Sequence, residues 1–185
     1  MKSPFVLVVR PFAAVLLLSS LAAVAGAAGT PAKEAPLTDA NIAAIVLAAN
    51  TIDIDNGKLA QQKSSNESVK AFAQMMITDH TSVNDKAKAL AAKLSLKPVP
   101  NAPSKNLVKS MNAKRSTLAK NKGAAFDKAY LDNEISYHEA VIHMLDQQLI
   151  PGASNAELKD LLTSVRPAFE AHLTHARETR AALKD

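Results

Sequence analysis

Four long stretches of the sequence place apolar residues at helical spacing, and each stretch carries a side chain able to bind metal on or beside its apolar stripe. Residues three and four apart share one face of a helix, so these stripes predict amphipathic helices around a common core. A polar group on a buried face needs a partner, so polar side chains within these stripes constrain the fold and mark a candidate site. These polar residues are Asp53, His80, Glu134, His138 and His172, with His175 at the edge of the last stripe.

The pattern predicts four core helices with recognisable ends. Thr38 is a good N-cap residue, and the side chains around it fit a hydrophobic staple. Ser65 or Asn66 is expected to cap the second helix, and Ser154 or Asn155 the fourth. With their caps, the predicted helices cover about 38–60, 65–95, 124–150 and 154–182, within one bundle domain over 38–182.

The connection between the second and third core helices, residues 96–123, is unusually long. Three prolines near its start remove backbone donors and forbid continuation of the helix. Residues 104–122 then carry a weak apolar pattern among six lysines and arginines, which predicts a short surface helix. Ferritin-like bundles have one long crossover at this place. The predicted fold class is therefore all-α, a ferritin-like four-helix bundle with an extra helix in its crossover.

The N-terminus predicts export. Lys2 and Arg10 flank the start of an apolar run that ends in Ala25-Gly26-Ala27, a cleavage pattern, so residues 1–27 are interpreted as a signal peptide. The run is too short and too rich in small residues for a membrane span, and no other run in the mature chain is long enough to be one. Residues 28–37 are a flexible, Pro-containing lead-in. We expect a periplasmic protein, or one attached to the outer envelope through an envelope protein partner.

Composition excludes several classes of function. The chain has no Cys, which rules out disulfides and thiolate metal sites. Without Lys2 and Arg10, the chain has 20 basic and 17 acidic side chains, spread along the predicted helices. That mild balance, with few aromatic residues, argues against a nucleic-acid partner. Neither a Gly-rich phosphate loop nor a nucleophile elbow is present. The inward imidazoles and carboxylates are therefore the candidate functional groups.

Two interpretations of these polar residues stay open on the sequence alone. In the first, they bind one transition-metal ion, and their ligand types suit Zn, Fe, Mn or Cu. In the second, the bundle is a metal-free scaffold or interaction protein whose core holds imidazole–carboxylate pairs, such as Asp53 with His80 or Glu134 with His172. Such pairs would fix the helix register and make stability sensitive to acid.

A third interpretation, a metal-dependent oxidoreductase of the ferritin-like kind, fits less well. Di-iron carboxylate bundles take Glu-x-x-His from two of their helices. Here Ile77 stands three residues before His80, and Phe169 three before His172. The sequence therefore favours a non-enzymatic protein over an enzyme.

Several segments resemble a bacterial family of exported proteins. Residues 53–60, DIDNGKLA, resemble its acidic-x-acidic-x-GKLA segment, and VKAFAQ at 69–74 with Asp79-His80 resembles its VKAFAQ and DH signature. AFDKAY (125–130) and HEAV (138–141) resemble the third helix of the family, and FEAHL (169–173) resembles its last helix. The family is the "domain of unknown function 4142", and the resemblance covers residues 38–180. It implies a ferritin-like four-helix bundle and no established activity. The family usually has Glu at positions 53 and 55 and an apolar residue at position 56.

Overall fold

The helices begin at the capping residues that the sequence predicts. In the computed structural model, which describes residues 36–183, Thr38 Oγ1 accepts a hydrogen bond from the backbone N–H of Asn41 at 3.2 Å. Asn66 caps the second core helix and Asn155 the last in the same way. The predicted signal peptide (1–27) and all but the last two residues of the lead-in (28–37) lie outside the described residues.

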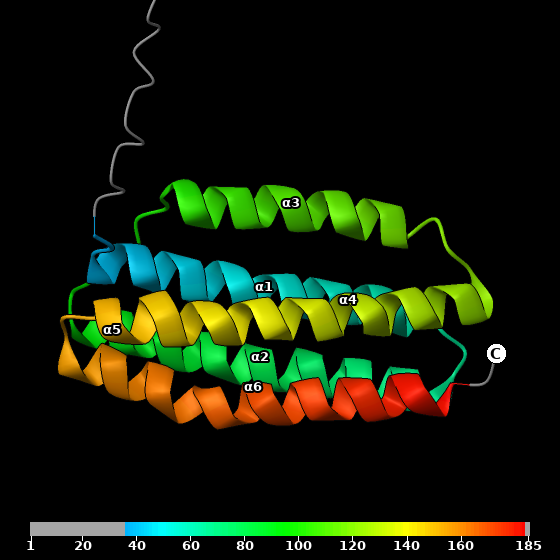
Figure 1. The fold of residues 1–185 in the computed structure, drawn as a ribbon. Coiled ribbons are helices and arrows are strands. Elements are labelled where there is room, and N and C mark those ends of the chain that lie inside the picture. Colours follow the sequence, from blue (N-terminus) through cyan, green and yellow to red (C-terminus); the bar gives the residue numbers. More distant parts are fainter. Residues whose placement is uncertain (1–35, 184–185) are drawn as a thin grey trace, which may run out of the picture. The chain divides into compact units, whose positions relative to one another are not determined.

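Residues 36–183 form an all-α bundle without strands, as predicted (Figure 1). Its elements are α1 (Asp39–Lys63), α2 (Glu67–Lys93), α3 (Ala102–Leu118), α4 (Gly123–Met144), the π-helical turn η1 (Leu145–Leu149), α5 (Ile150–Gly152) and α6 (Ala156–Ala182). The third predicted helix, 124–150, differs from expectation because its C-terminal part widens into the π-helical turn. No helix within 36–183 is both long enough and apolar enough to span a membrane.

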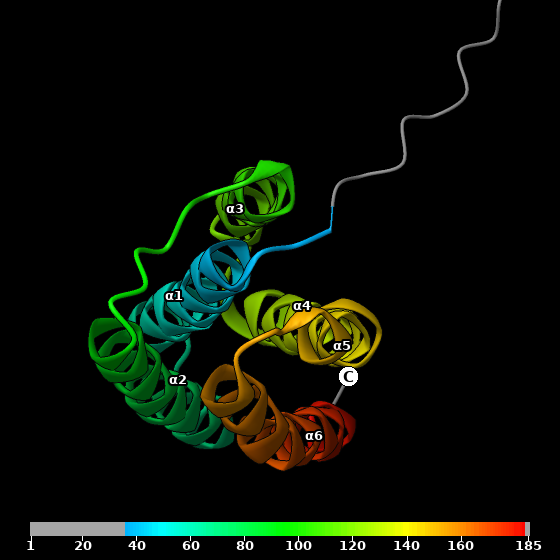
Figure 2. The same cartoon turned by 90° about the vertical axis from the view of Figure 1, so that its left-hand side faces the viewer.

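Helices α1, α2, α4 and α6 surround the core, and α3 lies on the outside of α1 (Figure 2). The backbone N–H of Val99 donates to Ala40 O at 2.9 Å, which places the end of the α2–α3 loop beside the start of α1. At the other end of the bundle, Lys63 Nζ donates to Ala119 O. Helix α3 therefore runs the length of α1, and the crossover helix is confirmed.

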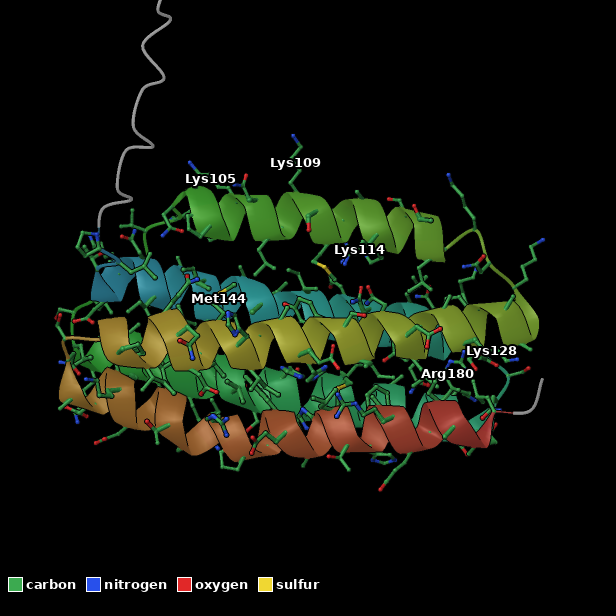
Figure 3. All side chains as sticks on the ribbon, viewed as in Figure 1. Lys105, Lys109, Lys114, Lys128, Met144 and Arg180 are labelled. Carbon is green, nitrogen blue, oxygen red and sulfur yellow. The ribbon has the colours of Figure 1, made fainter. Side chains whose placement is uncertain are left out.

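Helix α3 covers α1 with one face only. Ser104, Met111 and Leu118 are buried on that face. Lys105 and Lys109 extend away from the other helices (Figure 3). The crossover thus adds a solvated, cationic helix without entering the core between the four long helices.

The apolar core is divided into two clusters along the bundle. One contains Ile42, Val141 and Leu162, and the other contains Phe72, Tyr130 and Leu131. Because both clusters pack on the same four helices, those helices are held in register on either side of the polar residues that lie in the core.

Gly57 lies at a close approach of α1 to α2, and replacing it by alanine is expected to destabilise the protein. A Cβ at position 57 would lie 2.8 Å from Ala73 O and 2.9 Å from Ile77 Cγ1. Overpacking against backbone outweighs the helix propensity gained, so the free energy of unfolding should fall by about 1–2 kcal/mol in urea titrations. Gly152→Ala is the matched control, because its Cβ would meet Ile42 Cδ1 at an ordinary 3.7 Å. Equal effects of the two changes would contradict the close approach.

Candidate metal centre

The five core residues singled out in the sequence converge from four helices. They are nearly inaccessible, with exposed fractions from 0% for Glu134 to 3% for His172. Ligand atoms of His80, His138 and His172 lie within 4.8 Å of one another, and so do those of Asp53, Glu134 and His138. His138 belongs to both groups. We call these five residues, Asp53, His80, Glu134, His138 and His172, the core cluster.

His175 does not join the core cluster. Its side chain is exposed, and its ring meets Phe72 edge-on with the ring centroids 5.7 Å apart. The helical repeat accounts for this, since a residue three positions after His172 is rotated off the inward direction. The supporting role predicted for His175 is therefore without a geometric basis.

Hydrogen bonding fixes the proton of His80 on the nitrogen that points away from the cluster. Asn50 Nδ2 donates to Val46 O at 2.9 Å, which leaves Asn50 Oδ1 as an acceptor facing His80. The Nδ1–H of His80 donates to that oxygen at 2.7 Å. The imidazole tautomer follows from the partner of its protonated nitrogen. His80 Nε2 therefore presents a lone pair to the cluster.

Hydrogen bonds also determine the tautomers of the other two histidines. The Nδ1–H of His138 donates to the backbone carbonyl of Glu134 at 2.9 Å. The Nε2–H of His172 donates to Asp79 Oδ2 at 2.9 Å. A carbonyl and a carboxylate can only accept, so the remaining nitrogens, His138 Nε2 and His172 Nδ1, also carry lone pairs.

These three nitrogens and two carboxylate oxygens have no hydrogen-bond partner among residues 36–183. The atoms are His80 Nε2, His138 Nε2, His172 Nδ1, Asp53 Oδ1 and Glu134 Oε2. The three imidazole nitrogens can only accept, and buried acceptors without donors are costly. Converging lone pairs of this kind can be satisfied by a cation, a proton or a water molecule.

The spacing of the imidazole rings fits a shared ion. The ring centroids are 5.7 Å apart for His80 and His138, 5.2 Å for His80 and His172, and 5.5 Å for His138 and His172. Three imidazoles bound tetrahedrally at the usual metal–nitrogen distance would place their centroids about 5.3 Å apart. Phe169 stacks on His80 with the centroids 5.2 Å apart, which holds that ring in its orientation.

Burial keeps the three imidazoles neutral. Desolvation lowers the pKa of His80 well below its usual value, and the neighbouring histidines add to this. Desolvation also lowers the pKa of His138, to about 4, and lowers that of His172. The neutral imidazole is the form that binds metal, so the three histidines are in their ligand state at pH 7.

The two carboxyl groups resist ionisation in this environment. Burial raises the pKa of Asp53, and the charge of Glu134 raises it further. Burial raises the pKa of Glu134 to about 7, against opposing hydrogen bonds. Asn56 Nδ2 is one donor, at 3.3 Å from Glu134 Oε1. Either a shared proton or a nearby cation would reduce the repulsion between the two buried carboxylates.

The residues that orient the cluster were not predicted from the sequence. Asn50, Asn56 and Asp79 all bond to cluster members. The structure pairs His172 with Asp79 and not with Glu134, the pairing considered from the sequence. A usable signal existed in α1, since Asn50, Asp53 and Asn56 recur every three residues on one face.

Comparison with known proteins identifies a family and a similar fold. The model of the family described as "Domain of unknown function (DUF4142)" matches residues 22–179. The fold is similar to that of a DUF305 protein from Streptomyces coelicolor that is described as a candidate secreted protein. The TM-score is 0.63 at 13% identity, over 78% of this chain and 94% of that chain. At this identity the similarity concerns the fold alone. Among proteins with curated descriptions, none matches the sequence.

Proposed function

The chain belongs to the family described as domain of unknown function 4142, and on that premise we propose that it is an exported bundle protein that binds one transition-metal ion between its four core helices. The family description names no reaction, so the proposal is argued from the site. The ligands are the three imidazoles and two carboxylates of the core cluster. Export is supported by the signal pattern of residues 1–27 and by the description of the similar Streptomyces coelicolor protein.

One observation carries the proposal: three buried imidazoles each donate their N–H outward to an acceptor, so that their lone pairs converge. A satisfied polar core would instead place a donor against each of these three nitrogens. Here Asp53 Oδ2 lies 3.6 Å from His80 Nε2, beyond good hydrogen-bond distance, and that nitrogen carries no proton to donate. The arrangement therefore favours the metal-binding interpretation over the metal-free one.

The ligand set fits one ion of a particular class. Imidazole nitrogens with carboxylate oxygens suit Zn, Fe, Mn or Cu, and the absence of Cys removes the softer thiolate sites. Both ligand groups share His138, which supports one ion held between them. Two carboxylates are few for a carboxylate-bridged pair of irons. We therefore propose binding of one ion without assigning an oxidoreductase reaction.

Metal analysis of protein purified from the periplasm without a His tag tests the proposal. About one equivalent of transition metal is expected in the unmodified protein, and none in the double variant His80→Ala, His172→Ala. Conversely, the metal-free interpretation is correct if neither protein contains metal and the double variant is simply less stable. Two irons with oxygen consumption would instead support the oxidoreductase.

Asp79 is expected to strengthen metal binding through His172 without touching the ion. Its carboxylate accepts the Nε2–H of His172, the arrangement that orients a metal-binding imidazole and raises its basicity. Asp79→Asn should weaken the affinity roughly 10–100-fold in competition titrations with a chelator. The control is Asp85→Asn on the same helix, an exposed residue 3.9 Å from Lys88, which should leave the affinity unchanged. Equal affinities in both variants would refute the role of Asp79.

A further inference from the structure

We propose that the core contains a second binding place, a small apolar cavity that takes one neutral diatomic molecule, such as dioxygen or nitric oxide, beside the metal ion. The proposal rests on the proposed function, because it names the kind of molecule that would reach the bound ion. It stands on a separate set of residues, most of which are not ligands.

The cavity adjoins the core cluster on one side only. Asp53, His80 and His138 line it, together with Asn50, while His172 and Glu134 do not. The other walls are apolar. They are formed by Val46, Ala49, Val141, Leu145, Leu149, Leu162, Val165 and Phe169. Val46 and Asp53 lie about two turns apart on α1, so the lining residues span roughly 10 Å of that helix.

The size of the cavity limits what it can hold. About 20 Å³ is open to the centre of a water-sized sphere. One water molecule needs at least about 10–15 Å³ of such space, so the cavity suits one or two atoms and not a larger substrate. A small molecule in contact with Asp53, His80 and His138 would lie within reach of an ion held by those side chains.

The apolar walls select against charge. Eight of the twelve lining residues have no side-chain hydrogen-bonding group, and apolar cavity walls take up apolar ligands. Burial of a charge there would be costly. The class of ligand that remains is small, neutral and weakly polar.

The π-helical turn helps to form the cavity. Leu145 and Leu149 are the first and last residues of η1, both are buried, and both line the cavity. A π-helical turn alters the register of a helix, and such turns occur frequently at functional sites. Both leucines lie in the wall of the cavity.

Xenon is the probe for the cavity itself, because it is apolar and requires no metal. In chelator-treated protein under xenon pressure, saturable shifts are expected for NMR signals of the Val46, Val141 and Leu149 methyl groups. Val69 and Leu131, in the other apolar cluster, should not shift. Ala49→Leu should abolish the shifts by filling the space, and Leu145→Ala should enlarge them. Should Ala49→Leu fail to fold, Val165→Leu replaces it. Shifts that are absent, or unchanged by filling, overturn the proposal.

Nitric oxide is the probe for contact with the ion. Protein loaded with Fe(II), with its metal content measured first, should give a paramagnetic nitrosyl signal in the unmodified form. Ala49→Leu should keep the iron, since Ala49 is not a ligand, and should lose most of that signal. An unchanged signal overturns the proposal. Protein that takes up xenon but contains no metal would contradict the proposed function instead, so the two failures are distinguishable.

Discussion

Replacing His138 by alanine is expected to remove metal from the protein more completely than any other single change. His138 is the residue shared by both ligand groups, and its Nε2 is one of the converging acceptors. Loss of a direct ligand should reduce the affinity by more than about 100-fold, beyond the range for residues that only orient a ligand. Elemental analysis and competition with a chelator measure both the content and the affinity.

The controls for this prediction are the two exposed histidines. His143 and His175 lie outside the core cluster, so His143→Ala and His175→Ala should retain one equivalent of metal. Retention of metal by the His138 variant, or its loss from a variant of an exposed histidine, would show that the ion is bound elsewhere.

Glu134→Gln is expected to stabilise the metal-free protein at pH 8 by about 3 kcal/mol while reducing metal binding. Burial raises the pKa of Glu134 from 4.5 to about 7, and a shift of this size corresponds to that free energy. Glutamine keeps an oxygen for Asn56, which donates to Glu134 Oε1, and gains an N–H that can donate toward Asp53. A buried ionisable acceptor is thus exchanged for a neutral group with a donor.

The size of this stabilisation depends on pH. The folded protein holds the Glu134 proton more tightly than the unfolded chain does. The contribution of Glu134 to stability is therefore greatest below pH 4.5 and is lost as the pH rises to about 7. The gain from glutamine should accordingly be small at pH 4.5 and complete at pH 8. Urea titrations of chelator-treated protein at both values measure it. A gain that is largest in acid would contradict the raised pKa.

The histidines act in the opposite direction in the same pH range. The pKa of His138 is lowered to about 4, and that of His80 is lowered as well. The stability that they contribute is complete above pH 6.5 and is lost as the pH falls. In the unmodified protein these slopes oppose that of Glu134. The glutamine variant should therefore lose stability in acid more steeply than the unmodified protein does.

The fold followed from local patterns that tertiary contacts did not override. Asparagine or threonine caps at Thr38, Asn66 and Asn155 start helices where predicted, and the crossover helix lies at the expected place. The π-helical turn was not predictable, because Leu145 and Leu149 fit an α-helical stripe equally well. Its register is set by packing and not by local preference.

The core cluster was predictable because helical phase alone decides which side chains face inward. Helical phase does not predict the residues that hydrogen-bond to the cluster and orient it. Asp79 lies on the flank of its helix, and its side chain turns to His172 across the α2–α6 interface. At position 56, where the family usually has an apolar residue, this chain has Asn56, which donates to Glu134. Both contacts depend on side-chain conformation, which the spacing of residues does not specify.

The partial exposure of Asp79, beside the buried core cluster, has a kinetic consequence. The Asp79 side chain is 46% exposed, whereas every member of the cluster is nearly inaccessible. An ion bound to the proposed site would exchange with solvent only after a local opening of the bundle, and we expect this opening between α2 and α6, beside Asp79. The rate of chelator extraction would then report the frequency of this opening and not the strength of the metal–ligand bonds. Tight retention and slow loading would be two results of the same restricted passage.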